Sequence, residues 1–226
     1  MKAHAQRGLT LIEMVIAITL LAIMISAIVF SFDGDKSRAQ VLIAAMNEYG
    51  SALERMKTDT SCYPRNLDAL FDRTQSEGAA KSFCQADLSK QWNGPYVKSA
   101  PAKASSVDSA VRAIMMAQIS PELELRIGRI DSAFGSGGGG GTGVPTSKWF
   151  IVADNVPSGI VTQAEVACNG IDDSQQQNIS GQRKCAISGR SQTLLGYNPA
   201  GLNLQDHTAN GGSLGSVAML FNETRK

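Results

Sequence analysis

The chain has 226 residues, enough for one globular domain with an additional segment. Its composition is ordinary, with 43% hydrophobic and 18% charged residues and a formal net charge of +1. So small a charge, without a long basic block, argues against a protein that binds nucleic acid through bulk electrostatics.

The first predicted element is an apolar helix from Leu9 to Phe32. Glu13 is the one charged residue in this run, and neither Pro nor Gly interrupts it. As a helix the run would be about 36 Å long at 1.5 Å per residue, enough to cross a roughly 30 Å hydrocarbon core. Basic side chains precede it, so the positive-inside rule puts residues 1–8 in the cytoplasm and everything after Asp33 outside.

Two ordinary explanations of this run are incomplete. A cleaved secretory signal has an apolar region of about 7–15 residues followed by a small-x-small cleavage site, and the sequence at 28–33 offers no such site. A plain signal anchor fits the length but does not explain Glu13. An acidic residue at a helix centre costs roughly 2.5–3.5 kcal/mol on insertion, and less near the interface. The carboxylate is therefore a candidate functional group.

The segment RGLTLIE, from Arg7 to Glu13, resembles the processing motif of type IV prepilins and of the pseudopilins of type II secretion. The resemblance implies that a prepilin peptidase cuts between Gly8 and Leu9 and that Leu9 is then N-methylated. It also gives Glu13 a partner, the N-terminal amine of a neighbouring subunit in a helical filament. Two opposite charges buried together cost far less than either alone, and their pairing fixes the axial register.

A helical period resumes after the Asp-Gly-Asp sequence at 33–35. Over residues 33–58 the apolar side chains recur at i, i+3, i+4 and i+7, namely Leu42, Ala45, Met46, Tyr49, Ala52, Leu53 and Met56. We therefore predict one N-terminal helix over residues 9–58. Its first part, 9–32, serves as the transmembrane and assembly segment, and its amphipathic second part packs against a head domain.

The head domain is predicted over residues 59–226, in the periplasm or outside the cell. Its first part, 59–105, is rich in turns and has short helical hints near 66–73. The sequence WNGPY at 92–96 is similar to a turn that often follows the long helix in pseudopilins and some pilins. Its two aromatic rings, on either side of an Asn-Gly-Pro turn, are expected to pack on the head.

The second part of the head reads mainly as strands. A short helix is predicted over 107–119, and the alternation of polar and apolar residues over 122–130 predicts a half-buried strand. A strand at 148–153 is expected to pair antiparallel to it, with further strands near 159–166, 192–198 and 214–221. The predicted fold class is α+β and pilin-like, with a long N-terminal helix, half of it transmembrane, packed on an antiparallel sheet.

The four cysteines predict two disulfides. Cysteines behind a membrane-targeting segment indicate an oxidising compartment. Four cysteines allow three pairings, and we favour Cys62–Cys84 with Cys168–Cys185. Each of these bonds closes a loop of about 20 residues, which is worth roughly 3 kcal/mol in the chain-entropy model.

No catalytic, cofactor or metal site is predicted. The glycine-rich sequence at 135–143 lacks the Gly-Lys-Ser/Thr ending of a phosphate loop and is interpreted as a connector. Asp172 and Asp173 lie in the loop between the last two cysteines without the spaced acidic series of a calcium site. His207 is the one histidine outside the first eight residues, and its neighbours form no catalytic signature. An enzyme is therefore not expected.

The predicted function is a structural subunit, a pilin of a type IV pilus-like filament used for adhesion, motility or DNA transfer. The resemblance implies an inner-membrane precursor with a periplasmic head. It also implies several partners: the prepilin peptidase, an inner-membrane platform with its assembly ATPase, minor pilins, and further copies of the chain in a cell-surface filament.

Three alternatives stay open. One is a pseudopilin of a type II secretion system, and another is a minor tip pilin whose head binds a surface or DNA. The third is a periplasmic enzyme on a plain signal anchor. The size of the predicted head favours a type IVb-like pilin over a pseudopilin, whereas the short leader argues against that class.

Overall fold

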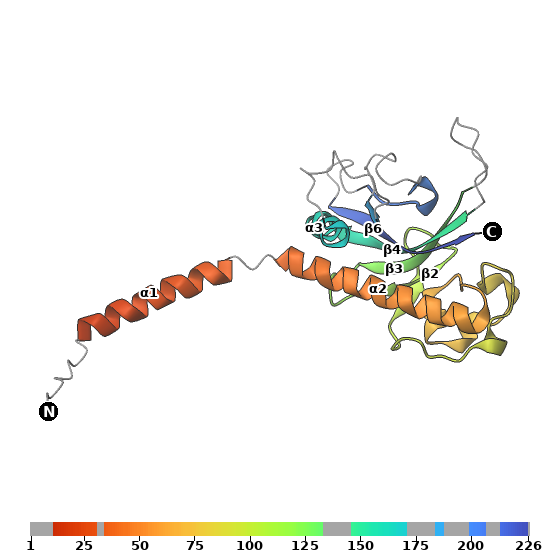
Figure 1. Cartoon of the computed structure of the whole chain (residues 1–226), viewed down its shortest axis with the longest axis horizontal. Helices are drawn as coiled ribbons and strands as arrows, with labels where there is room; N and C mark the ends of the chain where they lie inside the picture. Colours follow the sequence, from red (N-terminus) through yellow and green to blue (C-terminus); the bar gives the residue numbers. More distant parts are fainter. Residues whose placement is uncertain are drawn as a thin grey trace, which may run out of the picture. The chain divides into compact units, whose positions relative to one another are not determined.

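The computed structural model describes residues 11–30, 34–132, 146–170, 184–187, 199–206 and 213–225. The chain divides into two compact units at Gly34/Asp35. The first unit contains helix α1 (Leu11–Phe30), and the second begins with helix α2 (Gly34–Thr60) and continues into the head (Figure 1). The predicted single helix is thus described as two helical stretches, and residues 31–33 between them lie outside the described part.

A single antiparallel sheet forms the centre of the second unit. In the described residues its strands follow the order β1-β2-β3-β4-β6-β5. They are β1 (Ala102–Ala104), β2 (Arg112–Met115), β3 (Glu124–Ser132), β4 (Thr146–Pro157), β5 (Cys185–Ile187) and β6 (Leu214–Arg225). The other elements are helix α3 (Ser158–Asn169) and the short 3-10 helices η1 (Leu67–Leu70), η2 (Arg73–Ser76), η3 (Ala79–Lys81), η4 (Ser89–Gln91) and η6 (Pro199–Leu202).

The three long strands form the middle of the sheet. In the register, Ile127 of β3 lies opposite Ile151 of β4, which lies opposite Met219 of β6. All three side chains belong to the main core, as the alternation of a pleated strand requires. The predicted strands at 122–130, 148–153 and 214–221 are therefore confirmed, together with the antiparallel pairing of the first two.

Helix α2 buries the predicted apolar stripe against the sheet. Its fully buried side chains are Ala39, Leu42, Met46, Ala52, Leu53 and Met56, and Tyr49 is 8% exposed. Gly50 of α2 faces Phe221 of β6. A Cβ atom at Gly50 would be 3.0 Å from the Cβ atom of Phe221. The absence of a side chain at Gly50 therefore permits the close approach of helix and strand. This packing accounts for a residue of low helix propensity within α2.

Strand β4 is buried on both faces. Trp149, Ile151 and Ala153 point into the main core, which α2 and α3 help to form. Phe150 and Val152 point the other way, into a smaller core that Leu202 of η6 closes. A strand buried on both sides reads as a continuous apolar run, which is how the sequence WFIVA appears.

The predicted helix over 107–119 is wrong, because the chain forms a turn there and then strand β2. The side chain of Ser105 accepts hydrogen bonds from the backbone N–H groups of Val107 and Asp108, at 3.2 and 3.3 Å. The carboxylate of Asp108 in turn accepts from the N–H of Ala110 at 3.1 Å. Such local bonds compete with helical ones, and they hold this segment in a turn.

The predicted strand at 159–166 is also wrong, because this segment lies within α3. Ile160, Val161 and Ala164 are fully buried, which is the spacing of one helical face. Pro157 precedes the helix, a position where the missing N–H is tolerated. Packing against the sheet thus overrides the strand preference of a short β-branched run. The strand predicted at 192–198 lies outside the described residues.

Candidate assembly helix and the head attached to it

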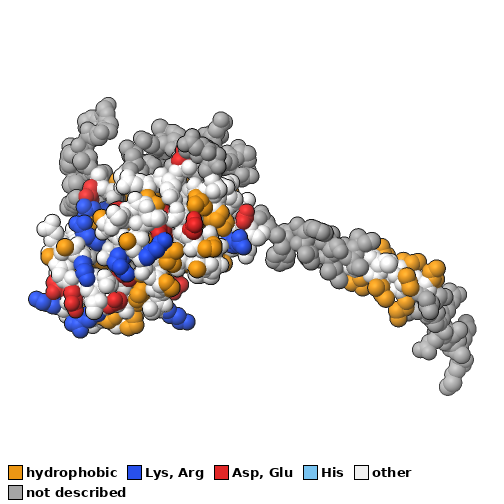
Figure 2. All heavy atoms as spheres, turned by 180° about the vertical axis from the view of Figure 1, so that it is seen from behind, with side chains coloured by type: hydrophobic (Ala, Val, Ile, Leu, Met, Phe, Trp, Pro, Cys, Tyr) orange, Lys and Arg blue, Asp and Glu red, His pale blue; other side chains and the backbone are white. Residues whose placement is uncertain are grey.

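Helix α1 exposes apolar side chains around its whole described circumference. They include Ile12 at 68% and Ile18 at 62% exposure, and the others are Met14, Val15, Ile16, Leu20 and Leu21. Glu13, also exposed, is the one charged residue between Leu11 and Phe30. Figure 2 shows the described side chains of α1 as largely apolar, whereas Lys, Arg, Asp and Glu are scattered over the head. A helix that is hydrophobic on all sides requires burial by something outside it.

Gly8 and Leu9, the predicted cleavage and methylation sites, lie outside the described residues together with the rest of the predicted leader, 1–8. The described helices include none that is both long enough and apolar enough to cross a membrane.

The head is joined to α2 by a partly buried polar contact. Glu54 accepts a hydrogen bond from the Tyr63 hydroxyl and another, at 2.5 Å, from the Asn222 side chain of β6. Burial raises the pKa of the Tyr63 hydroxyl, and the neighbouring Glu54 raises it further. This contact could not be predicted from the sequence. Glu54 lies off the apolar stripe, and its strand partner is 168 residues away.

A second buried network joins β3, β4 and β6. Arg126 Nε lies 2.6 Å from Asp154 Oδ2, and the Ser216 hydroxyl donates to Asp154 Oδ1 at 2.5 Å. The Arg126 guanidinium also donates to the carbonyl oxygen of Leu202 at 2.6 Å. Burial raises the pKa of Asp154, and the positive charge of Arg126 opposes that effect. These buried charges are thus paired and hydrogen-bonded.

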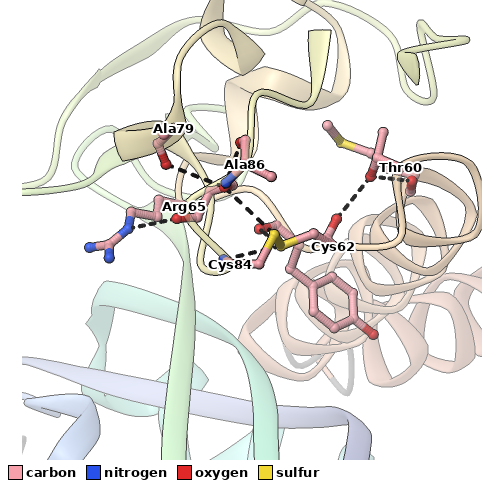
Figure 3. Close-up of a disulfide and its surroundings, with 9 residues drawn as sticks. Thr60, Cys62, Arg65, Ala79, Cys84 and Ala86 are labelled. Carbon is pink, nitrogen blue, oxygen red and sulfur yellow. Dashed lines mark hydrogen bonds between the residues drawn. A yellow bond between two sulfur atoms is a disulfide. The ribbon is translucent and has the colours of Figure 1, made fainter. Parts of the chain in front are cut away.

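The Cys62–Cys84 disulfide holds the segment that follows α2 (Figure 3). The Cys84 N–H lies 3.2 Å from Cys62 Sγ. The Phe83 N–H donates to the carbonyl oxygen of Tyr63 at 3.1 Å, and the Arg65 N–H donates to that of Lys81 at 2.8 Å. Two short stretches of chain are therefore joined side by side at the end of α2.

The second disulfide, Cys168–Cys185, joins the end of α3 to the edge strand β5. The side chain of Asn169 pairs with both backbone groups of Cys185, at 3.0 and 3.1 Å. These bonds hold a strand of three residues that has one neighbour in the sheet. Both pairings are those favoured by loop length.

The WNGPY segment packs the loops onto α2. Trp92 Nε1 donates to the carbonyl oxygen of Ala69 at 2.8 Å, and the Tyr96 hydroxyl donates to Asp59 at 2.7 Å. The two rings meet edge to face, with centroids 5.9 Å apart. The expected aromatic packing is confirmed.

Among the described residues, no three His, Cys, Asp or Glu side chains gather closely enough to hold a metal ion. Asp172, Asp173, His207 and the glycine-rich sequence at 135–143 lie outside those residues. The interpretations given to them above stay predictions.

Comparison with known proteins matches residues 3–29 to a family described as the prokaryotic N-terminal methylation motif. Similar proteins include the type II secretion system core protein G of Klebsiella michiganensis, 28% identical over 118 residues, which are 48% of this chain and 83% of that protein. The core protein G of Aeromonas hydrophila is 27% identical over 48% of this chain and 82% of its own length. That of Klebsiella pneumoniae is 27% identical over 46% of this chain and 81% of its own length. No solved structure matches the chain significantly.

Proposed function

We propose that this chain, a member of the type IV pilin and pseudopilin family, is a structural subunit that polymerises through α1 into a helical filament. The observation that carries the proposal is the largely apolar exposed surface of α1 over residues 12–21, in which Glu13 is the one charged side chain. In a filament the helices of neighbouring subunits would cover that surface. Before assembly, the inner membrane would cover it, with the head in the periplasm.

Processing is part of the same proposal. A prepilin peptidase cuts the chain between Gly8 and Leu9, and the new N-terminal residue is methylated. The free amine of one subunit then pairs with Glu13 of its neighbour. Apolar packing alone specifies the stagger between helices poorly, whereas a buried charge pair permits one register. The assembly ATPase, the membrane platform and minor pilins are the further partners that this route requires.

The relatives favour a pseudopilin of a type II secretion system over a pilus subunit. Three of them are named as core protein G of that system, and the similarity spans more than four fifths of each. About half of this chain lies outside the aligned region, so the head contains sequence without a counterpart there. The prediction of a type IV pilus rests on the size of that head.

The assembly role is tested by replacing Glu13. Glu13→Val is expected to leave membrane insertion and the fold of the head intact but to abolish or disorder the filaments, because the register pair is lost. Glu77→Val, at an exposed position of the head, is the matched control and should assemble normally. Filaments are counted by electron microscopy and the membrane pool by immunoblotting. Normal filaments from Glu13→Val would contradict the proposal.

Deletion of the gene in its own bacterium separates the two kinds of filament. A pseudopilin predicts loss of protein secretion across the outer membrane, with surface pili unaffected. A pilus subunit predicts the reverse, and each outcome excludes the other assignment.

A further inference from the structure

A pocket opens beside the Cys62–Cys84 disulfide. Its volume is ≈ 450 Å³, within the range of small-ligand sites. Three aromatic rings and two cationic side chains contribute to its lining: Tyr63, Phe83, Trp149, Lys57 and Arg129. They come from the last turn of α2, from the disulfide-linked segment, and from β3 and β4. The disulfide sulfurs and the hydroxyls of three Ser or Thr residues complete the wall.

The lining residues contain cations and no carboxylate. The Lys57 ammonium lies 4.8 Å from the centroid of the Tyr63 ring, and it forms no ion pair with any described residue. A ring face attracts a cation through its quadrupole but carries no net charge, so the Lys57 charge is only partly compensated. Lys57 also lies near the C-terminus of α2, which favours a cation there. The helix terminus therefore explains why a lysine stands at position 57. The side chain nevertheless lines the pocket, so its charge is available to a ligand there.

The second cation lies across the aromatic wall. Arg129 lies 5.0 Å from the ring centroid of Phe83 and 5.6 Å from that of Trp149. Arg65 approaches the Phe83 ring at 5.4 Å and adds a third positive charge nearby. Two carboxylates contact the lining residues. Asp131, 35% exposed, lies 2.8 Å from Arg129 Nη2 and accepts a hydrogen bond from Ser147 at 2.6 Å, and Glu54 accepts one from the Tyr63 hydroxyl.

We propose that this pocket binds an organic anion, a carboxylate joined to an apolar or flat body. The carboxylate lies between Lys57 and Arg129, and the body packs on the aromatic rings and the disulfide. A small hydrated anion could use the charges alone, whereas this class of ligand also removes apolar surface from water. The inference concerns the head and does not depend on filament assembly.

Calorimetric titration of the full-length chain in detergent with sodium benzoate tests the site. Lys57→Met keeps the length and the apolar contacts of the side chain but removes its charge, and it is expected to weaken binding at least fivefold. Lys90→Met removes an exposed lysine from η4, outside the pocket, and should bind like the wild type. Absence of benzoate binding to the wild type, or equal affinities for the Lys57→Met variant and the wild type, would overturn the proposal.

A gain of affinity provides a test that misfolding cannot imitate. Asp131→Asn removes the carboxylate that competes for Arg129, so benzoate is expected to bind at least twofold more tightly. Unchanged or weaker binding would contradict the assignment of Arg129. Inorganic phosphate, as the second probe, should bind the wild type more weakly than benzoate does, and phosphate binding of equal strength would refute the proposed ligand class.

Discussion

Asp154 of β4 is joined to β3 by an ion pair with Arg126 and to β6 by a hydrogen bond from Ser216. Its ion pair with Arg126 is almost completely buried, with side chains 4% and 0% exposed. Removal of one partner from such a pair leaves an uncompensated charge in the interior, at a cost of about 3–5 kcal/mol. Asp154→Asn is therefore expected to lower the free energy of unfolding by about that amount.

The matched control for this substitution is Asp131→Asn. The Arg129–Asp131 pair has the same chemistry but is about one third exposed, with side chains at 32% and 35%. We expect a loss of about 1 kcal/mol or less there. Urea unfolding of both variants, followed by circular dichroism, measures the difference. Equal losses would show that burial of the Arg126–Asp154 pair does not increase its contribution to the free energy of unfolding.

Tyr63 gives the head a predictable dependence on alkaline pH. Burial and Glu54 raise the pKa of its hydroxyl above the ordinary value of 10.0. The unfolded chain therefore releases this proton at a pH where the folded chain retains it. The stabilising contribution is complete below about pH 10 and is lost as the pH rises above that value.

Above about pH 10 the wild type should lose up to about 1.4 kcal/mol per pH unit more than Tyr63→Phe, which has no proton to release there. Urea unfolding at a series of pH values measures the two slopes. The other tyrosines are present in both proteins, so their titration cancels in the comparison. Parallel slopes would mean that the hydroxyl titrates alike in the folded and unfolded chains.

At the scale of elements, the contact between α2 and β6 depends on Gly50. The higher helix propensity of Ala stabilises the helix by about 1 kcal/mol in Gly50→Ala. The new Cβ atom, however, lies against Phe221, and overpacking of this kind costs about 1–3 kcal/mol of stability. Because the Phe221 Cβ is fixed to the strand backbone, we expect net destabilisation, and a larger loss for Gly50→Val. Ser51→Ala, at the next and exposed position of α2, should be neutral or slightly stabilising. Thermal unfolding compares the three variants, and a stabilised Gly50→Ala would refute the close contact.

The elements that the sequence predicted correctly are those with a long and regular pattern. The stripe of α2 repeats over several turns, and β3 alternates cleanly, so each has one compatible structure. The two wrong predictions are the helix over 107–119 and the strand over 159–166. The structure of each segment depends on neighbours far along the chain. Ser105 illustrates this dependence, because its hydroxyl donates at 2.6 Å to Glu124 of β3.

The candidate site shows the same division. Glu13 and the cleavage motif are local in sequence, so they could be recognised without a structure. The pocket beside the first disulfide could not, because Lys57 and Arg129 belong to a helix and a strand whose contact the sequence alone does not reveal. Only the cysteines at 62 and 84 indicated in advance that this part of the chain is brought together.

At the scale of the whole molecule, the chain consists of two units whose surfaces differ in polarity. The first contains a largely apolar helix whose described side chains, residues 12–21, are exposed, and the second is a folded head with two cores and two disulfides. The head buries apolar side chains within itself, whereas the described apolar side chains of α1 are not covered. These properties fit a subunit that assembles through α1 and exposes its head.

The identity of the mature N-terminus tests this account most directly. The chain isolated from the cells that produce it should, by mass spectrometry, begin at Leu9 and bear one added methyl group. That start exposes the amine that we pair with Glu13. A chain that still begins at Met1 would contradict the account.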